Sequence, residues 1–382
     1  MSSRIRFANA AANYHRDQQA ITDAITSVLE SGRPVMGPDV KAFEEEFAAY
    51  VGAGYAVGVM SGSSALVLAL RSLGIGPGDE VITVANSDIP TSHAVALVGA
   101  RLVWADIDGR NFNIDPDQIE ERITDRTKVL MPVHMYGIPA EMDRILDIAR
   151  RHGLAVVEDA CLAVGASYRG RRVGSLGTVN AFSTSPNKML GGVGSGGAIT
   201  TDQVELYDRL NALRYYGKDA SPYALGSFKP AGAHSKAVAV GYNERLDSIQ
   251  AAVLRIRLRR LDADVARRRE IALMYADLLD GSDVRLPAAP PGAEPCWHSY
   301  TVRLPAERRD TVYESLYERG IETVRRYIPP NHLEECYQSL GYREGDLPET
   351  EAVARELLGL PCHPFLTDEE VGRVARELLD LL

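Results

Sequence analysis

Lysine is scarce in this chain. Only six of its 42 basic residues are lysines, namely Lys41, Lys128, Lys188, Lys218, Lys229 and Lys236. Such an arginine bias is also expected from a GC-rich genome. Because the arginine guanidinium stays protonated whereas a lysine amine loses its proton readily when buried, lysine is the basic residue suited to amine chemistry. Each of the six lysines is therefore a candidate for a reactive amine.

Long apolar runs, clustered cysteines and an excess of positive charge are also missing. No apolar run reaches the length of a membrane span, and the first residues lack the apolar core of a signal peptide, so we expect a cytoplasmic protein without a membrane partner. The formal net charge of -10 argues against a nucleic-acid-binding surface. Four scattered cysteines indicate neither a disulfide framework nor a metal site, and buried or idle thiols are expected at Cys161, Cys296, Cys336 and Cys362.

The composition that remains is that of a globular protein with a large core. The chain has 382 residues, of which 45% are hydrophobic and 25% charged, and this balance excludes a disordered chain. The length favours two or three domains.

Short apolar runs alternate with helical patterns between about residues 56 and 200. The runs rich in Val and Ile predict buried strands at 56–60, 80–85, 101–107, 128–135, 154–160 and 197–201. Helical patterns lie between them at 63–74, 90–100 and 139–153, and the last two contain glycines suited to helix ends. This alternation predicts an α/β fold with a mainly parallel sheet covered on both faces, and a ligand at the carboxyl ends of its strands.

The remainder of the chain predicts a second, smaller domain. A long amphipathic stretch runs from about Asp247 to Asp277, and a linker rich in Pro and Gly follows at 285–297. Beyond the linker the pattern indicates a strand or two and several helices, an α+β arrangement. We therefore predict a large α/β domain with an N-terminal arm over residues 1–250, and over residues 251–382 a long linking helix and a small C-terminal domain.

Three residues near the middle of the chain form the strongest chemical constellation. Asp159 ends a buried strand, and Ser183 and Lys188 lie in a loop that runs into the glycine-rich segment 190–197. An amine and an acid brought together at strand ends suit a pyridoxal-phosphate site, with Lys188 as the Schiff base and Asp159 keeping the pyridine nitrogen protonated. Each feature also has an ordinary structural explanation, since an Asp after a strand is often a helix N-cap and a glycine-rich loop is often a turn.

A tight turn before a helix offers a phosphate site. The turn comprises residues 61–64, Ser-Gly-Ser-Ser, and follows a predicted strand. Free amides and hydroxyls at a helix N-terminus bind phosphate, although a serine here is also an ordinary N-cap.

The ordered motifs VGAGYAVGVMSGSSAL, VVEDACLAVGASYRGRRVGSLG, FSTSPNKM, VGYNERLDSIQ and ELLGLPCHPFLTDEEV resemble the DegT/DnrJ/EryC1/StrS family of pyridoxal-phosphate-dependent aminotransferases. The similarity extends from the segment GRPVMGPDV to the C-terminus. It implies the fold type I aminotransferase architecture, a homodimer with composite active sites, and amino transfer from glutamate or glutamine. The implied acceptor is a keto-sugar nucleotide or a related cyclic ketone.

The resemblance also implies roles for single residues. Lys188 matches the Schiff-base lysine, Asp159 the acid on the pyridine nitrogen, and Ser183, Gly62 and Ser63 the residues that hold the cofactor phosphate. Two further residues match positions at the edge of the site: Asn243, which family members extend into the neighbouring subunit's phosphate site, and His332, a histidine of the small-domain loop. Arg325 and Arg326 are candidates for a substrate phosphate or carboxylate, or are simply solvated arginines.

Five residues depart from the family pattern around the cofactor ring. Asp88 stands where the family generally has an aromatic residue stacked on the ring. Leu162 replaces a polar residue that binds the ring hydroxyl, and Val164 replaces the histidine that follows. Ser185 and Ser195 replace a common histidine and a common acidic residue. The phosphate site, acid and lysine are retained, so cofactor binding is the firmer expectation and the substrate the more open one.

Other activities stay open at this point. Dehydratases of this fold typically carry histidine in place of the lysine, so Lys188 favours transamination, whereas Asp88 and Leu162 leave room for an elimination reaction. A non-catalytic regulatory homologue is another alternative. A dinucleotide-dependent dehydrogenase is disfavoured because no GxGxxG motif lies between a first strand and its helix.

Overall fold

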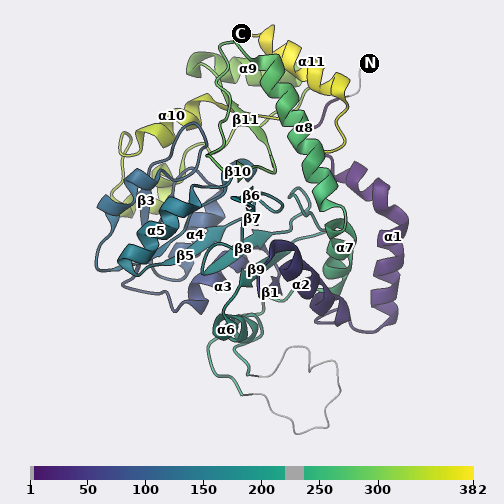
Figure 1. Cartoon of the computed structure of the whole chain (residues 1–382), viewed down its shortest axis with the longest axis vertical. Helices are drawn as coiled ribbons and strands as arrows, with labels where there is room; N and C mark the ends of the chain where they lie inside the picture. Colours follow the sequence, from purple (N-terminus) through teal and green to yellow (C-terminus); the bar gives the residue numbers. More distant parts are fainter. Residues whose placement is uncertain (1–3, 220–235) are drawn as a thin grey trace.

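The computed structural model describes residues 4–219 and 236–382, and Lys229 therefore lies outside the described residues. Its centre is a seven-stranded sheet with the order β1-β9-β8-β5-β4-β2-β3 (Figure 1). The strands are β1 (Tyr55–Val59), β2 (Glu80–Val84), β3 (Arg101–Ala105), β4 (Thr127–Leu130), β5 (Ala155–Asp159), β8 (Val179–Ser183) and β9 (Gly197–Thr201).

The sheet is mainly parallel, as the alternating pattern predicts. The pairs β2–β3, β2–β4, β4–β5 and β5–β8 are parallel, whereas β9 runs antiparallel to both β8 and β1. Strand β8 was not among the predicted strands, and Ser183 is its last residue rather than part of a loop. The α/β fold class is confirmed, and the β9 reversal is a detail that hydrophobic periodicity does not encode.

Helices cover both faces because side chains along each strand alternate between two cores. On β1, Val57 joins a core that contains residues of α3 (Gly62–Ser72), α4 (Ile89–Leu97) and α6 (Val204–Arg214). The preceding Ala56 joins the opposite core with α2 (Pro38–Val51) and α7 (Ser248–Leu258). Helix α5 (Met142–His152) covers β4 and β5 on that same side. Both faces are therefore buried, which explains why the strands are almost continuously apolar.

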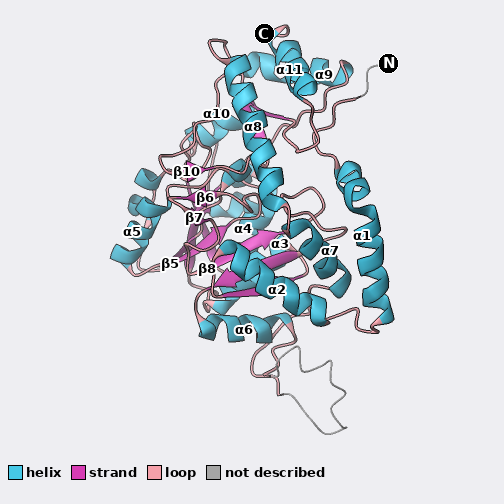
Figure 2. Ribbon diagram, turned by 45° about the vertical axis from the view of Figure 1, so that its right-hand side comes forward, coloured by secondary structure: helices cyan, strands magenta, loops and turns pink. Residues whose placement is uncertain are grey.

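The amphipathic stretch after Asp247 forms two helices instead of one. Helix α7 ends at Leu258, and α8 (Leu261–Leu279) begins after Arg260, whose φ of -122° and ψ of 6° leave the helical conformation. The pattern continues through the break because α8 contributes Val265 to the core beside α7 and Tyr275 to a separate core further along. Figure 2 shows α8 running from the large sheet towards α9 and α11.

The C-terminal part has its own small sheet. Strand β11 (Tyr300–Arg303) pairs antiparallel with β12 (Leu357–Leu360), and α9 (Ala306–Glu318), α10 (Pro348–Glu356) and α11 (Asp368–Leu379) surround it. Further elements include α1 (Ala10–Glu30), which packs along α7, and the short strands β6 (Ser167–Tyr168), β7 (Arg171–Arg172) and β10 (Ala293–Glu294).

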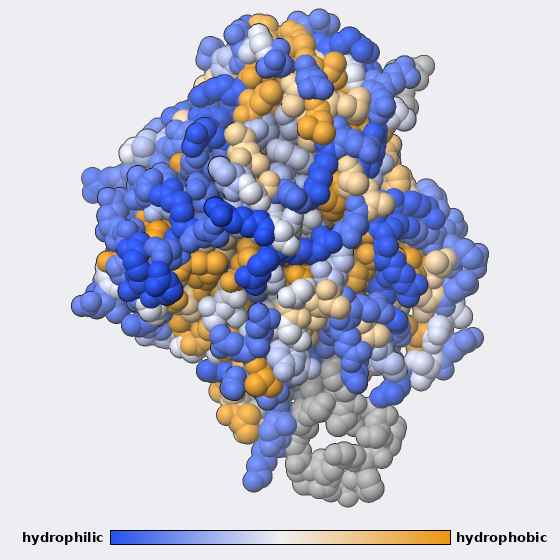
Figure 3. All heavy atoms as spheres, viewed as in Figure 1, coloured by the Kyte–Doolittle hydropathy of each residue, from blue (hydrophilic) through white to orange (hydrophobic). Residues whose placement is uncertain are grey.

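Hydropathy is distributed unevenly over the molecular surface. Hydrophilic side chains dominate the face shown in Figure 3, with hydrophobic ones in scattered groups. Within residues 4–219 and 236–382, no helix combines the length and the apolar character needed to cross a bilayer.

Candidate functional site

A cavity of about 260 Å³ lies at the carboxyl ends of the parallel strands. It brings together most of the site residues expected from the sequence, which come from segments far apart along the chain. The lining includes Gly62, Ser63, Asp88, Asp159, Ser183 and Lys188. Such a position, outside the ends of the strands, is where open α/β sheets bind ligands.

The turn at Ser61 is both a helix cap and one wall of this cavity. The Ser61 hydroxyl accepts a hydrogen bond of 3.0 Å from the backbone N–H of Ser64, so the ordinary N-cap explanation is correct. It leaves the amides of Gly62 and Ser63, in the first turn of α3, without helical partners. A side chain on Gly62 would place its Cβ 2.7 Å from the Cβ of Ser183. Only glycine allows this close approach of the two segments. It brings the hydroxyl groups of Ser63 and Ser183, which are donors suited to a phosphate, to the same cavity.

Asp159 is fixed at the floor of the cavity. Asp159 is only 3% exposed. It ends β5 and no helix begins after it, so it is not an N-cap. The Thr91 hydroxyl donates to Oδ2 at 2.7 Å, and the backbone N–H of Cys161 donates to Oδ1 at 3.2 Å. Two donors hold the carboxylate in one orientation, as an acid that must meet a ring nitrogen requires. Thr91 carries no motif and was missed from the sequence.

Lys188 presents an unengaged amine to the same space. Its backbone N–H donates to the Ser185 carbonyl at 2.9 Å, which fixes the turn after β8. Within the described part of the chain, no carboxylate or hydrogen-bond acceptor engages the Lys188 amine. By contrast, Lys41 lies 3.6 Å from Glu45, Lys128 donates to the Asp125 carbonyl, and Lys218 lies over the Tyr215 ring. Lys188, the lysine expected to be reactive, thus faces the cavity.

The glycine-rich segment 190–197 is held by protein groups. The Gln250 side chain accepts hydrogen bonds from the amides of Val193 and Gly194 at 3.0 and 3.1 Å, and the Gly192 amide donates to the Thr184 carbonyl. These three amides are already satisfied, so they are not available to an anion. Its contribution to the cavity is Ser195.

The five departures from the family pattern occupy different surroundings. Asp88 lines the cavity and caps α4, with its carboxylate accepting from the Ile89 amide at 3.0 Å. Leu162, Ser185 and Ser195 also line the cavity, whereas Val164 is buried in the core beneath α2. Four of the five therefore face the space where a cofactor ring or substrate would lie.

Cys161 contributes a thiol that was expected to be idle. It lines the cavity, and burial together with the negative charge of Asp159 raises the pKa of the thiol well above its ordinary value. The group is therefore a neutral wall of the site and not a nucleophile.

Three expected site residues lie outside this cavity. His332 is buried beside Trp104, and its Nε2 bonds Glu351 Oε1 at 3.1 Å, an arrangement that gives it a structural contact instead of a substrate-facing one. Arg325 pairs with Asp310 at 2.7 Å. Asn243 is exposed and forms an isolated antiparallel β-bridge with Tyr215.

Arg326 lies in an adjoining cavity of about 90 Å³ that also includes Lys188. Its guanidinium is 5.5 Å from the Phe7 ring centre, and no carboxylate among the described residues pairs with it. A half-buried arginine without a carboxylate partner is suited to an anionic group of a ligand. Metal binding has no comparable support, since the described residues contain no cluster of His, Cys, Asp and Glu arranged as a metal site.

Comparisons with known proteins agree with this geometry. The model of the DegT/DnrJ/EryC1/StrS aminotransferase family matches residues 15–379. A dTDP-3-amino-3,4,6-trideoxy-alpha-D-glucose transaminase from Streptomyces venezuelae is 44% identical over 372 residues, which are 97% of this chain and 94% of that protein.

Two solved structures extend the comparison to three dimensions. The crystal structure of S. venezuelae DesV in complex with a ketimine intermediate has a TM-score of 0.92 at 43% identity, with 99% of this chain and 98% of that one covered. NtdA from Bacillus subtilis with bound cofactor PMP has a TM-score of 0.86 at 31% identity, with 96% and 82% covered.

Proposed function

Since the chain belongs to the DegT/DnrJ/EryC1/StrS aminotransferase family and is a pyridoxal-phosphate-dependent aminotransferase, we propose that it aminates the 3-keto group of a nucleotide-linked deoxy sugar. Glutamate or glutamine would supply the amino group. The observation that carries this proposal is the convergence of an unengaged lysine amine, a fixed buried carboxylate and a helix N-terminus on one cavity. The name of the S. venezuelae transaminase supports the position and the nucleotide.

The residues present fit the cofactor. The free amides at the start of α3, with the hydroxyls of Ser63 and Ser183, would hold its phosphate. Asp159, already oriented by Thr91, would hold the proton on the pyridine nitrogen, and Lys188 would bind the aldehyde carbon covalently. Among the departures, Leu162 would offer no hydrogen bond to the ring hydroxyl and Asp88 no aromatic face to the ring.

When bound, pyridoxal phosphate supplies the electron sink and carries the amino group between the two substrates. The chain's own residues provide the remaining chemistry. Lys188, once the donor amine had displaced it, would take the proton from the donor α-carbon and deliver it to the former aldehyde carbon of the cofactor. Asp159 would keep the ring nitrogen cationic throughout, because its carboxylate is buried and fixed by two donors.

Arg326 would orient the donor. Its guanidinium shares a cavity with Lys188 and has room for a donor carboxylate. In the proposed division into domains 1–250 and 251–382, Lys188 belongs to the first domain and Arg326 to the second. The substrate would then lie between the two domains, a common place for small-molecule sites.

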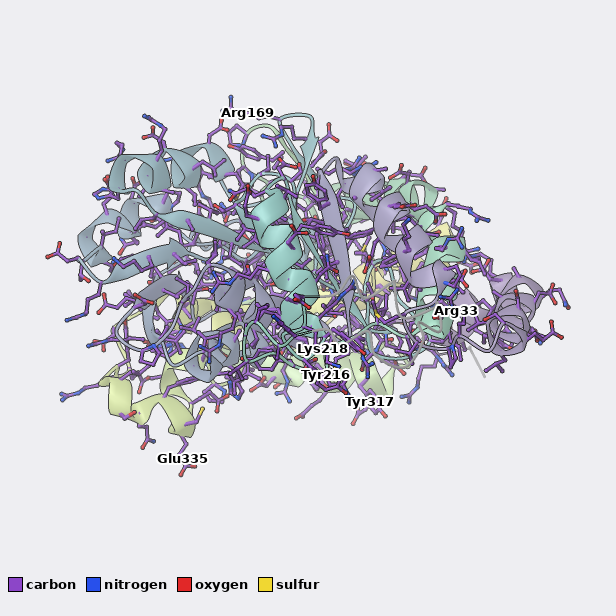
Figure 4. All side chains as sticks on the ribbon, turned by 90° about the horizontal axis from the view of Figure 1, so that it is seen from below. Arg33, Arg169, Tyr216, Lys218, Tyr317 and Glu335 are labelled. Atoms are coloured by element: carbon purple, nitrogen blue, oxygen red, sulfur yellow. The ribbon has the colours of Figure 1, made fainter. Side chains whose placement is uncertain are left out.

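We further propose a cytoplasmic homodimer with shared sites. Asn243 is exposed and lies outside the cavity of its own chain, as expected of a residue that completes a neighbour's site. Tyr216 and Lys218 project close together (Figure 4), and the Tyr216 amide donates to the carbonyl of Tyr242, the residue before Asn243. Mixing Lys188→Ala and Asn243→Ala proteins tests this idea, because only a mixed dimer regains one intact site. Recovery of about a quarter of wild-type activity is expected from random mixing, and no recovery would contradict shared sites.

The decisive test of the activity uses the purified holoenzyme. Adding glutamate or glutamine without a ketone should convert the aldehyde form of the cofactor into its amine form, seen as loss of the visible absorption band. Borohydride reduction followed by peptide mapping should place the cofactor on Lys188, and Lys41→Ala serves as the matched control that retains labelling. If neither donor changes the spectrum, the aminotransferase proposal is wrong.

Elimination and non-catalytic alternatives are not favoured. The chain keeps the lysine, the acid and the phosphate site together in one cavity, and the comparisons identify transaminases.

A further inference from the structure

The segment before α1 forms one wall of the small cavity beside Lys188. Phe7 and residues 8–10 line this cavity of about 90 Å³ together with Lys188 and Arg326. None of the sequence motifs that support the proposed activity lies in this segment. Its position nevertheless puts Phe7 beside the two residues that would handle the amino donor.

The same segment is fixed to the C-terminal part of the chain. The Ile5 amide donates to the Gly320 carbonyl at 2.8 Å, and the Glu322 amide donates back to the Ile5 carbonyl at 2.9 Å. The Phe7 amide donates to the carboxylate of Glu322 at 3.3 Å. Helix α1, which follows, packs along α7 instead. The segment therefore spans from the small sheet's surroundings to the large sheet's helices, with Phe7 held by its backbone where the two meet.

The Phe7 ring is a platform for the Arg326 guanidinium. The guanidinium carbon lies 5.5 Å from the ring centre, which is within the range of a cation–π contact. The ring also packs against β12, because a Cβ added to Gly359 would lie 3.6 Å from Phe7 Cε2. An arginine side chain has many rotamers, so a partner of fixed position restricts where its charge lies.

An aromatic partner differs from a carboxylate in what it leaves available. The adjacent Arg325 lies 4.2 Å from the Tyr313 ring centre, but it also pairs with Asp310 at 2.7 Å. Within residues 4–219 and 236–382, no carboxylate pairs with Arg326. An ion pair would neutralise the guanidinium, whereas a ring attracts it through its quadrupole and leaves the charge for a ligand. The contact with Phe7 thus orients Arg326 without occupying it.

Building on the proposed role of Arg326 in binding the amino donor, we propose that Phe7 is a positioning residue of the active site. Its ring holds the Arg326 guanidinium at the cavity beside Lys188, where a carboxylate of the donor binds. Phe7 acts through Arg326, so its loss should weaken donor binding and leave the rate at saturating donor almost unchanged.

The test measures donor binding in the first half-reaction. Rapid mixing of the holoenzyme with increasing glutamate or glutamine, followed by loss of the visible absorption band, gives an apparent Kd and a maximal rate. Phe7→Leu should raise the apparent Kd by about threefold to thirtyfold, the range of a cation–π contact, with the maximal rate within about twofold of wild type. Phe7→Tyr keeps an aromatic face and should keep the Kd within about twofold. An unchanged Kd in Phe7→Leu, or an equal loss in Phe7→Tyr, would overturn the proposal.

The matched control is Tyr313→Leu. It removes the ring beneath Arg325, the neighbour of Arg326 that already pairs with Asp310, so the donor Kd should not change. A loss as large as that of Phe7→Leu would show a general effect of packing around the small sheet and contradict the proposal. A raised KM for the keto-sugar in Phe7→Leu, with an unchanged donor Kd, would place the other substrate at this contact and contradict it as well.

A double-mutant cycle separates positioning from a purely structural role. Arg326→Met should raise the donor Kd by at least about tenfold, because it removes a charge-assisted bond. Adding Phe7→Leu to this variant should have no further effect, since Phe7 has no guanidinium left to hold. Additive losses would mean that Phe7 acts elsewhere and would overturn the proposal. Phe7→Met, whose flexible chain fills the same space, replaces Phe7→Leu if circular dichroism shows that the latter does not fold.

The outcomes also separate this proposal from the proposed function. An unchanged donor Kd in Arg326→Met refutes the role of Arg326, and with it that of Phe7, and leaves the aminotransferase intact. No conversion of the wild-type cofactor by either donor refutes the proposed function itself.

Discussion

Replacing Glu158 with glutamine should destabilise the protein more than any surface change of the same kind. The Glu158 side chain has no exposed surface and accepts four hydrogen bonds. Nε2 of His134 lies 2.9 Å from Oε2, and the amides of Gly174, Leu176 and Gly177 lie at 2.8, 2.7 and 2.6 Å. The Ala140 amide donates to the other nitrogen of His134, so Nε2 is the protonated one and must donate.

The magnitude follows from this set of partners. Each carboxylate oxygen accepts two bonds, so a glutamine amide must turn its NH₂ group towards two donors in either orientation. Hydrogen bonds to a charged group contribute roughly 1.5–3 kcal/mol each, and the glutamine amide leaves two of the four unmade. We expect Glu158→Gln to lower the free energy of unfolding by about 3–6 kcal/mol.

The assay is urea unfolding of the apo protein, with an unchanged slope and a lower midpoint. Glu335→Gln is the control, because Glu335 projects from the surface (Figure 4) and its loss should leave the midpoint unchanged. Burial acts to raise the pKa of Glu158, but bonding to His134 and the backbone amides outweighs it and lowers the pKa. The difference between wild type and variant should therefore be complete at pH 7 and shrink as the pH falls below about 4. A loss of less than about 1 kcal/mol at pH 7 would refute this reasoning.

Other predictions concern a buried ion pair between Arg214 and Glu44, and the cavity at the strand ends. Arg214→Met should cost about 3–5 kcal/mol in urea unfolding because it leaves Glu44 buried without its cation, and adding Glu44→Gln should recover much of the loss. Asp159→Asn should lower kcat by at least about a hundredfold while circular dichroism stays unchanged. Thr91→Val should lower kcat by about tenfold through misorientation of that acid, and an unchanged rate would contradict the role of its 2.7 Å bond. Cys161 should resist iodoacetamide near pH 8 because burial raises the pKa of its thiol, and peptide mapping would detect modification that contradicts this.

Much of the large sheet could be predicted from hydrophobic runs alone, because its strands are buried on both faces. Strand β8 was not predicted because its second residue is the polar Asn180. The side-chain amide of Asn180 donates to the carbonyls of Gly174 and Thr200. A polar side chain inside a strand looks like a loop until its partners are known. The helix end at Gly153 could be predicted from the sequence, because glycine easily adopts the left-handed conformation that ends many helices. In the structure, Gly153 has a φ of 66°.

The site residues likewise divide into those that the sequence predicts and those that it misses. Lys188 and Asp159 stand in motifs and could be found from the sequence. Thr91 could not, because its role depends on which distant segments the fold brings to the cavity. Thr91 reaches Asp159 across 68 positions of sequence. A single sequence contains no local signal for such pairings.

The adjacent carboxylates Glu158 and Asp159 show how stability and chemistry are joined in this fold. Successive side chains of a strand point to opposite faces, so Glu158 turns into the protein and fixes the turn at Gly174 to Gly177, while Asp159 turns into the cavity. The buried anchor holds the end of β5 in place, and with it the acid. By contrast, Asp88 and Leu162 line the cavity and also serve the fold, because Asp88 caps α4 and Leu162 packs into the core beside α5. Contacts with the ring can therefore vary while the anchor, the acid and the lysine stay fixed, and the choice of substrate becomes the part of this architecture that is free to change.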